Sequence, residues 1–134
     1  MSDPTDLASL AAVCHDAIAE HRFDESPSEA VGLIWPDGTI YRLVNEDEDP
    51  TAAYRVNRAR IATAIATNPH PPVALYHTHA GLATPSLADS RMLGHLAAAG
   101  NDTPTMFIFG SDGLRAWTWH DGAIKESDLG RTTP

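Results

Sequence analysis

Four side chains in one short stretch have the types and the spacing of a catalytic zinc site. His77 and His79 stand two residues apart in an apolar, β-rich run, so on a strand both imidazoles project from the same face. Ser86 and Asp89 follow at the spacing of a helix cap, which places Asp89 in a first helical turn, within reach of the strand end. Two imidazole nitrogens and one carboxylate oxygen leave the fourth position of a tetrahedral zinc ion open for water, as catalytic sites require.

Each half of this pattern also has an ordinary structural interpretation. Two histidines on one face of a strand often satisfy nothing more than hydrogen bonds within a sheet. A serine followed three residues later by an acidic residue is a common way to begin a helix. The zinc hypothesis therefore depends on the whole set and on the elements that position it.

The surrounding sequence predicts a mixed sheet covered by helices. Hydrophobic periodicity predicts helices over 6–21, 57–67 and 86–99, and strands over 30–35, 39–44, 53–56, 73–79, 105–109, 114–119 and 123–126. The first helix is expected to start from a cap at Asp3-Pro4 or Thr5. This order of elements favours one α/β domain spanning residues 1–134, with a loose tail from about 128 to 134.

Composition narrows the classes of partner. The chain has 134 residues, 43% of them hydrophobic, which is enough for a real core. Its formal net charge of −9 repels phosphate backbones, so we expect no nucleic acid partner. Without an apolar run of membrane-spanning length or a signal peptide, we expect no membrane partner and a cytoplasmic location. The one cysteine, Cys14, excludes an internal disulfide and a thiolate-rich zinc site.

The motif resembles that of a known family of metalloproteases. The segments "HTH" at 77–79 and "PS" at 85–86, followed by Asp89, are similar to the JAMM motif of the MPN/JAB1 (JAB1/Mov34/PAD-1) family, in its small prokaryotic or phage type. Upstream, "PSEAVGLI" at 27–34 resembles the glutamate segment that enters the first strand of these proteins. Family members usually have seven residues between the second histidine and the serine, whereas this chain has six. An asparagine, a proline and an aromatic residue also follow in the family's order, at Asn45, Pro50 and Tyr54.

The resemblance implies a fold, a cofactor and a set of roles. The fold would be an MPN/JAB1 domain, whose architecture is like that of cytidine deaminases. His77, His79 and Asp89 would bind Zn²⁺, and the zinc-bound water would act as the nucleophile. Glu29 would be the general base that takes the proton of this water and returns it to the leaving amine. The hydroxyl of Ser86 would donate to the oxyanion of the tetrahedral intermediate.

The resemblance further implies a peptidase or isopeptidase. Its substrate would be the amide bond after the C-terminus of a ubiquitin-like or sulfur-carrier protein, whose tail binds as an extended strand. The alternatives are a peptidase domain associated with phage tails or cell walls, and a non-catalytic MPN scaffold. Scaffolding members associate through paired helices, so a homodimer is left open. A nucleoside deaminase on the related architecture needs cysteine ligands that Cys14 alone cannot supply.

Overall fold

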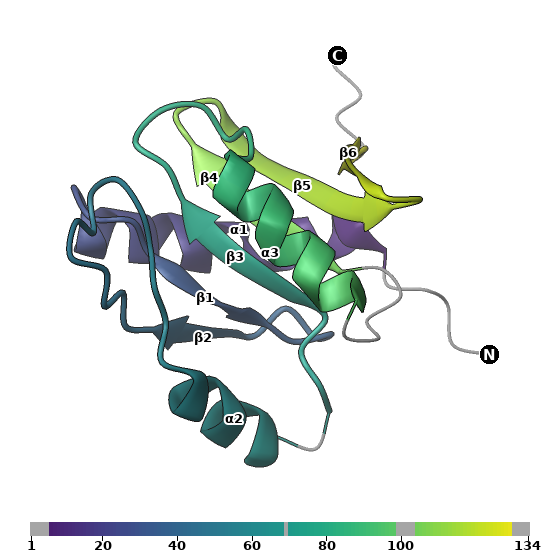
Figure 1. The fold of residues 1–134 in the computed structure, drawn as a ribbon, viewed down its shortest axis with the longest axis horizontal. Coiled ribbons are helices and arrows are strands. Elements are labelled where there is room, and N and C mark those ends of the chain that lie inside the picture. The colour runs from purple at the N-terminus through teal and green to yellow at the C-terminus, as the bar shows by residue number, and fades with distance from the viewer. Residues whose placement is uncertain (1–5, 69, 99–103, 130–134) are drawn as a thin grey trace.

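A six-stranded mixed sheet forms the centre of the molecule (Figure 1). The computed structural model describes residues 6–68, 70–98 and 104–129. In chain order the elements are α1 (Leu7–Glu25), β1 (Val31–Ile34), β2 (Ile40–Leu43), α2 (Arg58–Ala66), β3 (Ala74–Thr78), α3 (Leu87–Ala98), β4 (Thr105–Gly110), β5 (Gly113–His120) and β6 (Ala123–Ser127). The strand order is β2-β1-β3-β4-β5-β6, and only β3 and β4 pair in parallel. The α/β class with helices on a mixed sheet is confirmed.

The two faces of the sheet are covered by different helices. On one face α1 packs its apolar stripe against residues that alternate along β1, β3, β4 and β5, including Ile34, Tyr76 and Phe107. On the other face α2 covers the β1–β2 side and α3 covers β4 and β5 (Figure 1). Because neighbouring residues of a strand point to opposite faces, Tyr76 belongs to the α1 side and His77 to the α3 side.

The helix α1 begins and ends at different residues from those expected. Its N-cap is Asp6, whose side chain accepts from the backbone N–H groups of Ala8 and Ser9. The expected caps, Asp3-Pro4 and Thr5, lie outside the described residues. The helix continues past His21 to Glu25, because side chains of its last turn have partners elsewhere in the fold: Asp24 bonds to Arg42 on β2 at 2.9 Å.

Two further predictions are wrong: the strand at 53–56 and the inward face of α2. The third, a loose tail from about 128, can be compared with the structure only as far as Leu129. Residues 53–56 do not form a strand, since they lie in a loop tied back by side-chain hydrogen bonds. The apolar residues of α2 are expected to face inward, but only Ala64 and part of Ile61 are buried, while Ala62 and Ile65 are exposed. At the end of the chain Leu129 packs against the α1 core cluster, and residues 130–134 are outside the described part.

The helices of the described segments were compared with the requirements for crossing a membrane. None of these helices combines the length and the apolar character that crossing a bilayer requires.

Candidate metal centre

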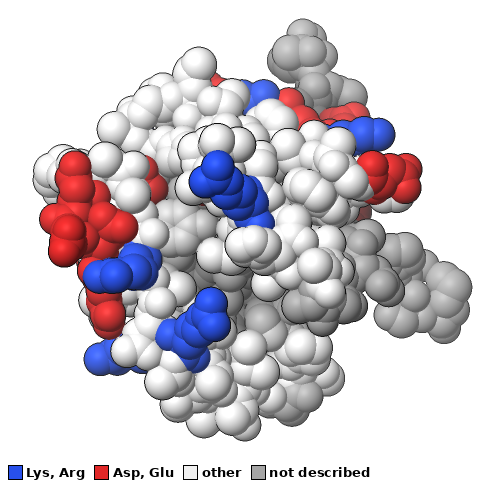
Figure 2. Space-filling model, viewed as in Figure 1, with Lys and Arg blue, Asp and Glu red and all other residues white. Residues whose placement is uncertain are grey.

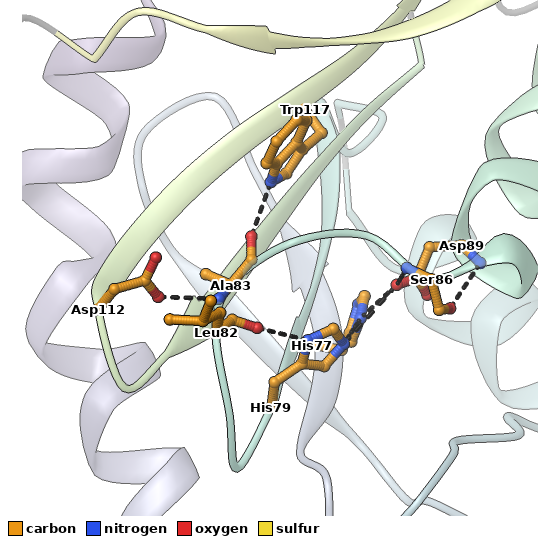
Figure 3. A network of polar contacts seen from close by, with 8 residues as sticks. All are labelled: His77, His79, Leu82, Ala83, Ser86, Asp89, Asp112 and Trp117. Atoms are coloured by element: carbon orange, nitrogen blue, oxygen red, sulfur yellow. Dashed lines mark hydrogen bonds and ion pairs between the residues drawn. The ribbon is translucent and has the colours of Figure 1, made fainter.

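The candidate metal centre lies where β3 ends and α3 begins (Figure 3). His77 is the fourth residue of β3, and His79 follows the strand directly. Both point to the α3 side of the sheet, where Asp89 faces them from the first turn of the helix (Figure 3). His77 and Asp89 are almost fully buried, at 1% and 3% exposure, whereas His79 is half-buried and reaches the surface.

Three ligand atoms meet at this point. Nε2 of His77 lies 3.0 Å from Nε2 of His79 and 3.2 Å from Oδ2 of Asp89. The third side of the triangle, from Nε2 of His79 to Oδ2 of Asp89, is 3.7 Å. Ligands at ordinary zinc–nitrogen and zinc–oxygen distances stand roughly 3.3–3.5 Å apart on a tetrahedron. The donor set and its spacing therefore fit one zinc ion with an open fourth position.

The turn before α3 fixes Asp89. The N–H of Ser86 donates to Oδ2 of Asp89 at 2.8 Å, and the N–H of Asp89 donates to the Ser86 hydroxyl oxygen at 3.1 Å. This is the reciprocal cap that the Ser-x-x-Asp spacing predicts, so the cap and the metal hypothesis use the same carboxylate. The hydroxyl proton of Ser86 is not used in the cap, and the residue lines a cavity beside the triangle.

The six-residue loop between His79 and Ser86 is anchored at several points. Nδ1 of His79 pairs with the Leu82 carbonyl at 3.0 Å, which directs Nε2 at the site. The Ala83 N–H donates to Asp112 at 2.8 Å, and the Trp117 indole donates to the Ala83 carbonyl at 2.9 Å (Figure 3). These bonds attach the loop to the β4–β5 hairpin.

Glycine at Gly110 allows this close attachment. A Cβ atom there would lie 2.5 Å from the Gly81 carbonyl oxygen and 2.6 Å from the Ala83 nitrogen, closer than side chains tolerate. The shorter loop therefore still brings Asp89 to the histidines.

Glu29 approaches the same histidines from the segment before β1. One of its carboxylate oxygens and a ring nitrogen of each of His77 and His79 all lie within 4.8 Å of one another. Glu29 could thus be a ligand itself, but Asp89 stands closer to both rings, at 3.2 and 3.7 Å. Both carboxylates are therefore candidate ligands, and Asp89 is the nearer of the two.

The two carboxylates have opposite electrostatic surroundings. Burial raises the pKa of Glu29 to about 7, aided by the charges of Asp89 and Asp47 and opposed by His79. Burial also disfavours the ionised form of Asp89, but hydrogen bonds from His77, His79 and the Ser86 N–H outweigh it and hold the pKa far below its usual range. Asp89 is therefore permanently ionised, as a ligand must be, while Glu29 can exchange a proton near neutral pH.

Burial and hydrogen bonding also shift the pKa values of the two histidines. Burial lowers the pKa of His77 despite the hydrogen bond to Asp89, so this imidazole is neutral and able to bind a cation. The hydrogen bond to Asp89 raises the pKa of His79. The Tyr54 ring lies 4.7 Å from the His77 ring, tilted by 35°. The Nδ1 atom of this buried imidazole has no hydrogen-bond partner among the described residues.

Sequence reasoning gave no role to two residues that shape the site. The amide of Asn45 donates to the Glu29 carbonyl at 2.9 Å and to the Ala53 carbonyl at 3.0 Å. Its oxygen accepts from the N–H of Arg55 at 3.1 Å, so one side chain holds the Glu29 segment beside the loop that carries Tyr54. The second residue is Arg22 of α1, which donates to the His79 carbonyl. The sequence pointed to Asn45 only through the resemblance to the family, and no motif around Arg22 predicted a role for it in the site.

Fold and site together define a class of protein: an α/β domain with a His-x-His pair at a strand end and a capping aspartate at the next helix. A family model described as prokaryotic homologs of the JAB domain matches residues 11–120. The chain belongs to this family, which confirms the resemblance to JAB/MPN domains. No curated protein matches the chain. Family and site together support a metal-dependent hydrolase, with Glu29, His77 and His79 among the residues that could hold the ion.

Proposed function

We propose that the protein is a zinc-dependent peptidase or isopeptidase that cleaves the amide bond after the C-terminus of a ubiquitin-like or sulfur-carrier protein. The observation that carries the proposal is the triangle of two imidazole nitrogens and one carboxylate oxygen, with sides of 3.0, 3.2 and 3.7 Å. His77, His79 and Asp89 would hold the ion. A bound zinc ion supplies a Lewis acid that lowers the pKa of water from about 15.7 to about 7.

Glu29 has the properties of the proton carrier in this reaction. A base works best when its pKa lies near the working pH, and burial brings Glu29 to about 7. Its carboxylate takes the proton of the attacking water and then gives it to the amine that leaves. The Asn45 amide orients the backbone that carries Glu29, at 2.9 Å from its carbonyl oxygen.

We assign to Ser86 the stabilisation of the oxyanion formed from the substrate. Its hydroxyl oxygen accepts the Asp89 N–H at 3.1 Å, which leaves the hydroxyl proton to donate into the adjoining cavity. Losing one such donor typically raises the barrier by roughly 3–4 kcal/mol. Thr51, Ala52, Ala53 and Tyr54 line the same cavity, and a glycine-rich tail is slender enough to lie along this backbone.

The surface agrees with a partner that has basic patches. The chain carries a formal net charge of −9. Figure 2 shows one group of acidic side chains over the loop that follows β2 and a second group, mixed with basic side chains, on the opposite side near β6. Of the four acidic residues in this loop, Glu46, Glu48 and Asp49 are exposed. Such a field speeds the approach of a basic partner.

A pair of variants separates the proton carrier from the metal ligands. Glu29→Gln should retain one zinc per chain but lose cleavage, because the amide cannot accept the proton. His77→Ala should lose both, because it removes a buried ligand nitrogen. Zinc content would be measured by atomic absorption after dialysis, and cleavage on the ubiquitin-like proteins encoded in the same genome, with the exposed-site variant Arg58→Gln as control. Equal zinc loss in both variants would contradict these roles, and a native chain without zinc would favour the scaffold.

A further inference from the structure

The metal centre lies between two cavities of similar size. One, of 420 Å³, opens toward α1, and the other, of 430 Å³, opens toward α3. The two cavities share Glu29, His79 and Ala80 as lining residues. A substrate whose scissile bond reaches the metal centre therefore extends into both.

Different side chains line the two cavities. The α3-side cavity contains Ser86, with apolar groups such as Leu82 and Met92 around it. The α1-side cavity contains Arg22 and the hydroxyl-bearing residues Ser26 and Ser28. Of the two cavities, the α1-side one is lined by an arginine and the other by no basic residue except His79, so the α1-side cavity suits a group that accepts several hydrogen bonds.

The guanidinium of Arg22 is held in place but not neutralised. Its Nε and Nη2 donate to the His79 carbonyl oxygen at 3.3 and 3.1 Å, and it lies 5.7 Å from the centroid of the Phe109 ring. Two of its five N–H groups are used in this way. No carboxylate of residues 6–68, 70–98 or 104–129 forms an ion pair with it. Three other arginines do have such partners: Arg42, Arg60 and Arg115.

The positions of Ser86 and Glu29 assign the two sides of the substrate. Ser86 lines only the α3-side cavity, so the carbonyl oxygen that it serves lies toward that cavity. Glu29 lines both cavities and delivers the proton to the amine. The amine component therefore departs through the α1-side cavity, past Arg22.

We propose that Arg22 recognises a carboxylate on the amine side of the scissile amide. The preferred substrate is then an amide whose amine component is an amino acid with a free carboxylate. This inference rests on the proposed peptidase function. The guanidinium is planar and has no ion-pair partner among the described residues, so it can donate two parallel N–H groups to a carboxylate. A carboxamide has one oxygen and no charge, so it would bind more weakly.

Three acetylated peptides test the inference. Each ends in Gly-Gly followed by one residue: alanine with a free carboxylate, alanine carboxamide, or aspartate carboxamide. The zinc-loaded native protein should cleave the free carboxylate with a kcat/KM roughly ten- to a hundredfold above that of alanine carboxamide. If aspartate carboxamide is preferred instead, the carboxylate that Arg22 binds is that of a side chain.

Variants at Arg22 show whether this side chain causes the preference. Arg22→Gln should abolish the preference, Arg22→Lys should keep part of it, and Arg58→Gln, an exposed arginine on α2, should leave it unchanged. A merely structural role of Arg22 would lower the rates for all three peptides alike. The same ratio should appear in peptide affinity measured by calorimetry on Glu29→Gln, which does not turn over. The inference about Arg22 is wrong if Arg22→Gln keeps the preference, or if the native chain shows no preference. Neither result would contradict the proposed peptidase function. Failure to bind or cleave any of the peptides overturns the proposed function as well.

Discussion

Two regions of the molecule present a carboxylate to the same pair of histidines, and they treat it in opposite ways. The turn that starts α3 provides Asp89 with the Ser86 N–H at 2.8 Å, and Nε2 of His77 on β3 lies 3.2 Å from the same carboxylate oxygen. The segment before β1 buries Glu29, and among the described residues the donor found for it, the Asn45 amide, bonds its backbone carbonyl and not its carboxylate. Asp89 therefore stays ionised, whereas Glu29 can gain or lose a proton near neutral pH, because the pKa of a carboxyl group depends on its solvation and hydrogen bonds.

Replacing Asp89 should have the largest effect. Asp89→Asn keeps the size of the side chain but removes the charge that faces both histidines. We expect loss of stoichiometric zinc and, in the zinc-free protein, a loss of about 1.5–3 kcal/mol in the free energy of unfolding, since hydrogen bonds to a charged acceptor are lost. Zinc analysis and urea denaturation would measure the two effects. Asp112→Asn is a matched control, because Asp112 holds the same loop from outside the triangle; equal zinc loss there would show that loop order, not ligand charge, binds the ion.

Replacing Glu29 should have a smaller effect of opposite sign. In the folded zinc-free chain its pKa is about 7, whereas an unfolded glutamate has a pKa of about 4.3. Between these values the unfolded chain binds fewer protons than the folded chain. The stability that Glu29 contributes is therefore fully present below pH 4.3 and is lost as the pH rises through 7.

Glu29→Gln should consequently be more stable than the native chain by about 1–2 kcal/mol at pH 8, a figure reduced for the partial exposure of this group. At pH 4 the two chains should differ little. Urea denaturation at both pH values in a metal chelator would measure the difference. An equal stability of the two proteins at pH 8 would show that Glu29 ionises without penalty and would remove the contrast with Asp89.

Replacing Ser86 should have the smallest effect on stability. Ser86→Ala removes the hydroxyl acceptor of the α3 cap but keeps the backbone N–H that bonds Asp89. The expected loss is about 1 kcal/mol, with zinc retained. Cleavage should fall far more, by roughly 10²–10³-fold, because the oxyanion donor is gone. Zinc loss in this variant would mean that the cap, rather than the charge, determines the position of Asp89.

The sequence contained the local half of the site. The His-x-His pair on a strand and the Ser-x-x-Asp sequence at a helix start span only two and three residues. Strand and helix geometry alone therefore determine which way these side chains point. Arg22 and Asn45 act over separations of 57 and 16 residues, to His79 and Glu29. Contacts of that kind depend on how elements pack, which neither periodicity nor capping determines.

The errors in the fold have the same origin. Residues 53–56 are β-rich, but their backbone bonds to Asn45 instead of extending the sheet. The polar residues after His21 predict a connection and not a helix. They continue α1 to Glu25, because Arg22 and Asp24 bond to residues of other elements. Ile65 fits an inward stripe on α2 but is 40% exposed, since this short helix covers only one side of the sheet.

The Asn45 clamp has a consequence for how the protein can change. Its amide bonds Glu29 at 2.9 Å and the loop residues Ala53 and Arg55 at 3.0 and 3.1 Å. The Glu29 N–H in turn donates to the Pro50 carbonyl of the same loop at 2.6 Å. The exposed side chains of Glu46 and Glu48 can thus be exchanged for others, but changes to the loop backbone around Pro50 would move Glu29. Substitutions at these exposed positions would change the charge of this face of the protein, whereas insertions or deletions in the loop would displace the carboxylate that faces the histidines.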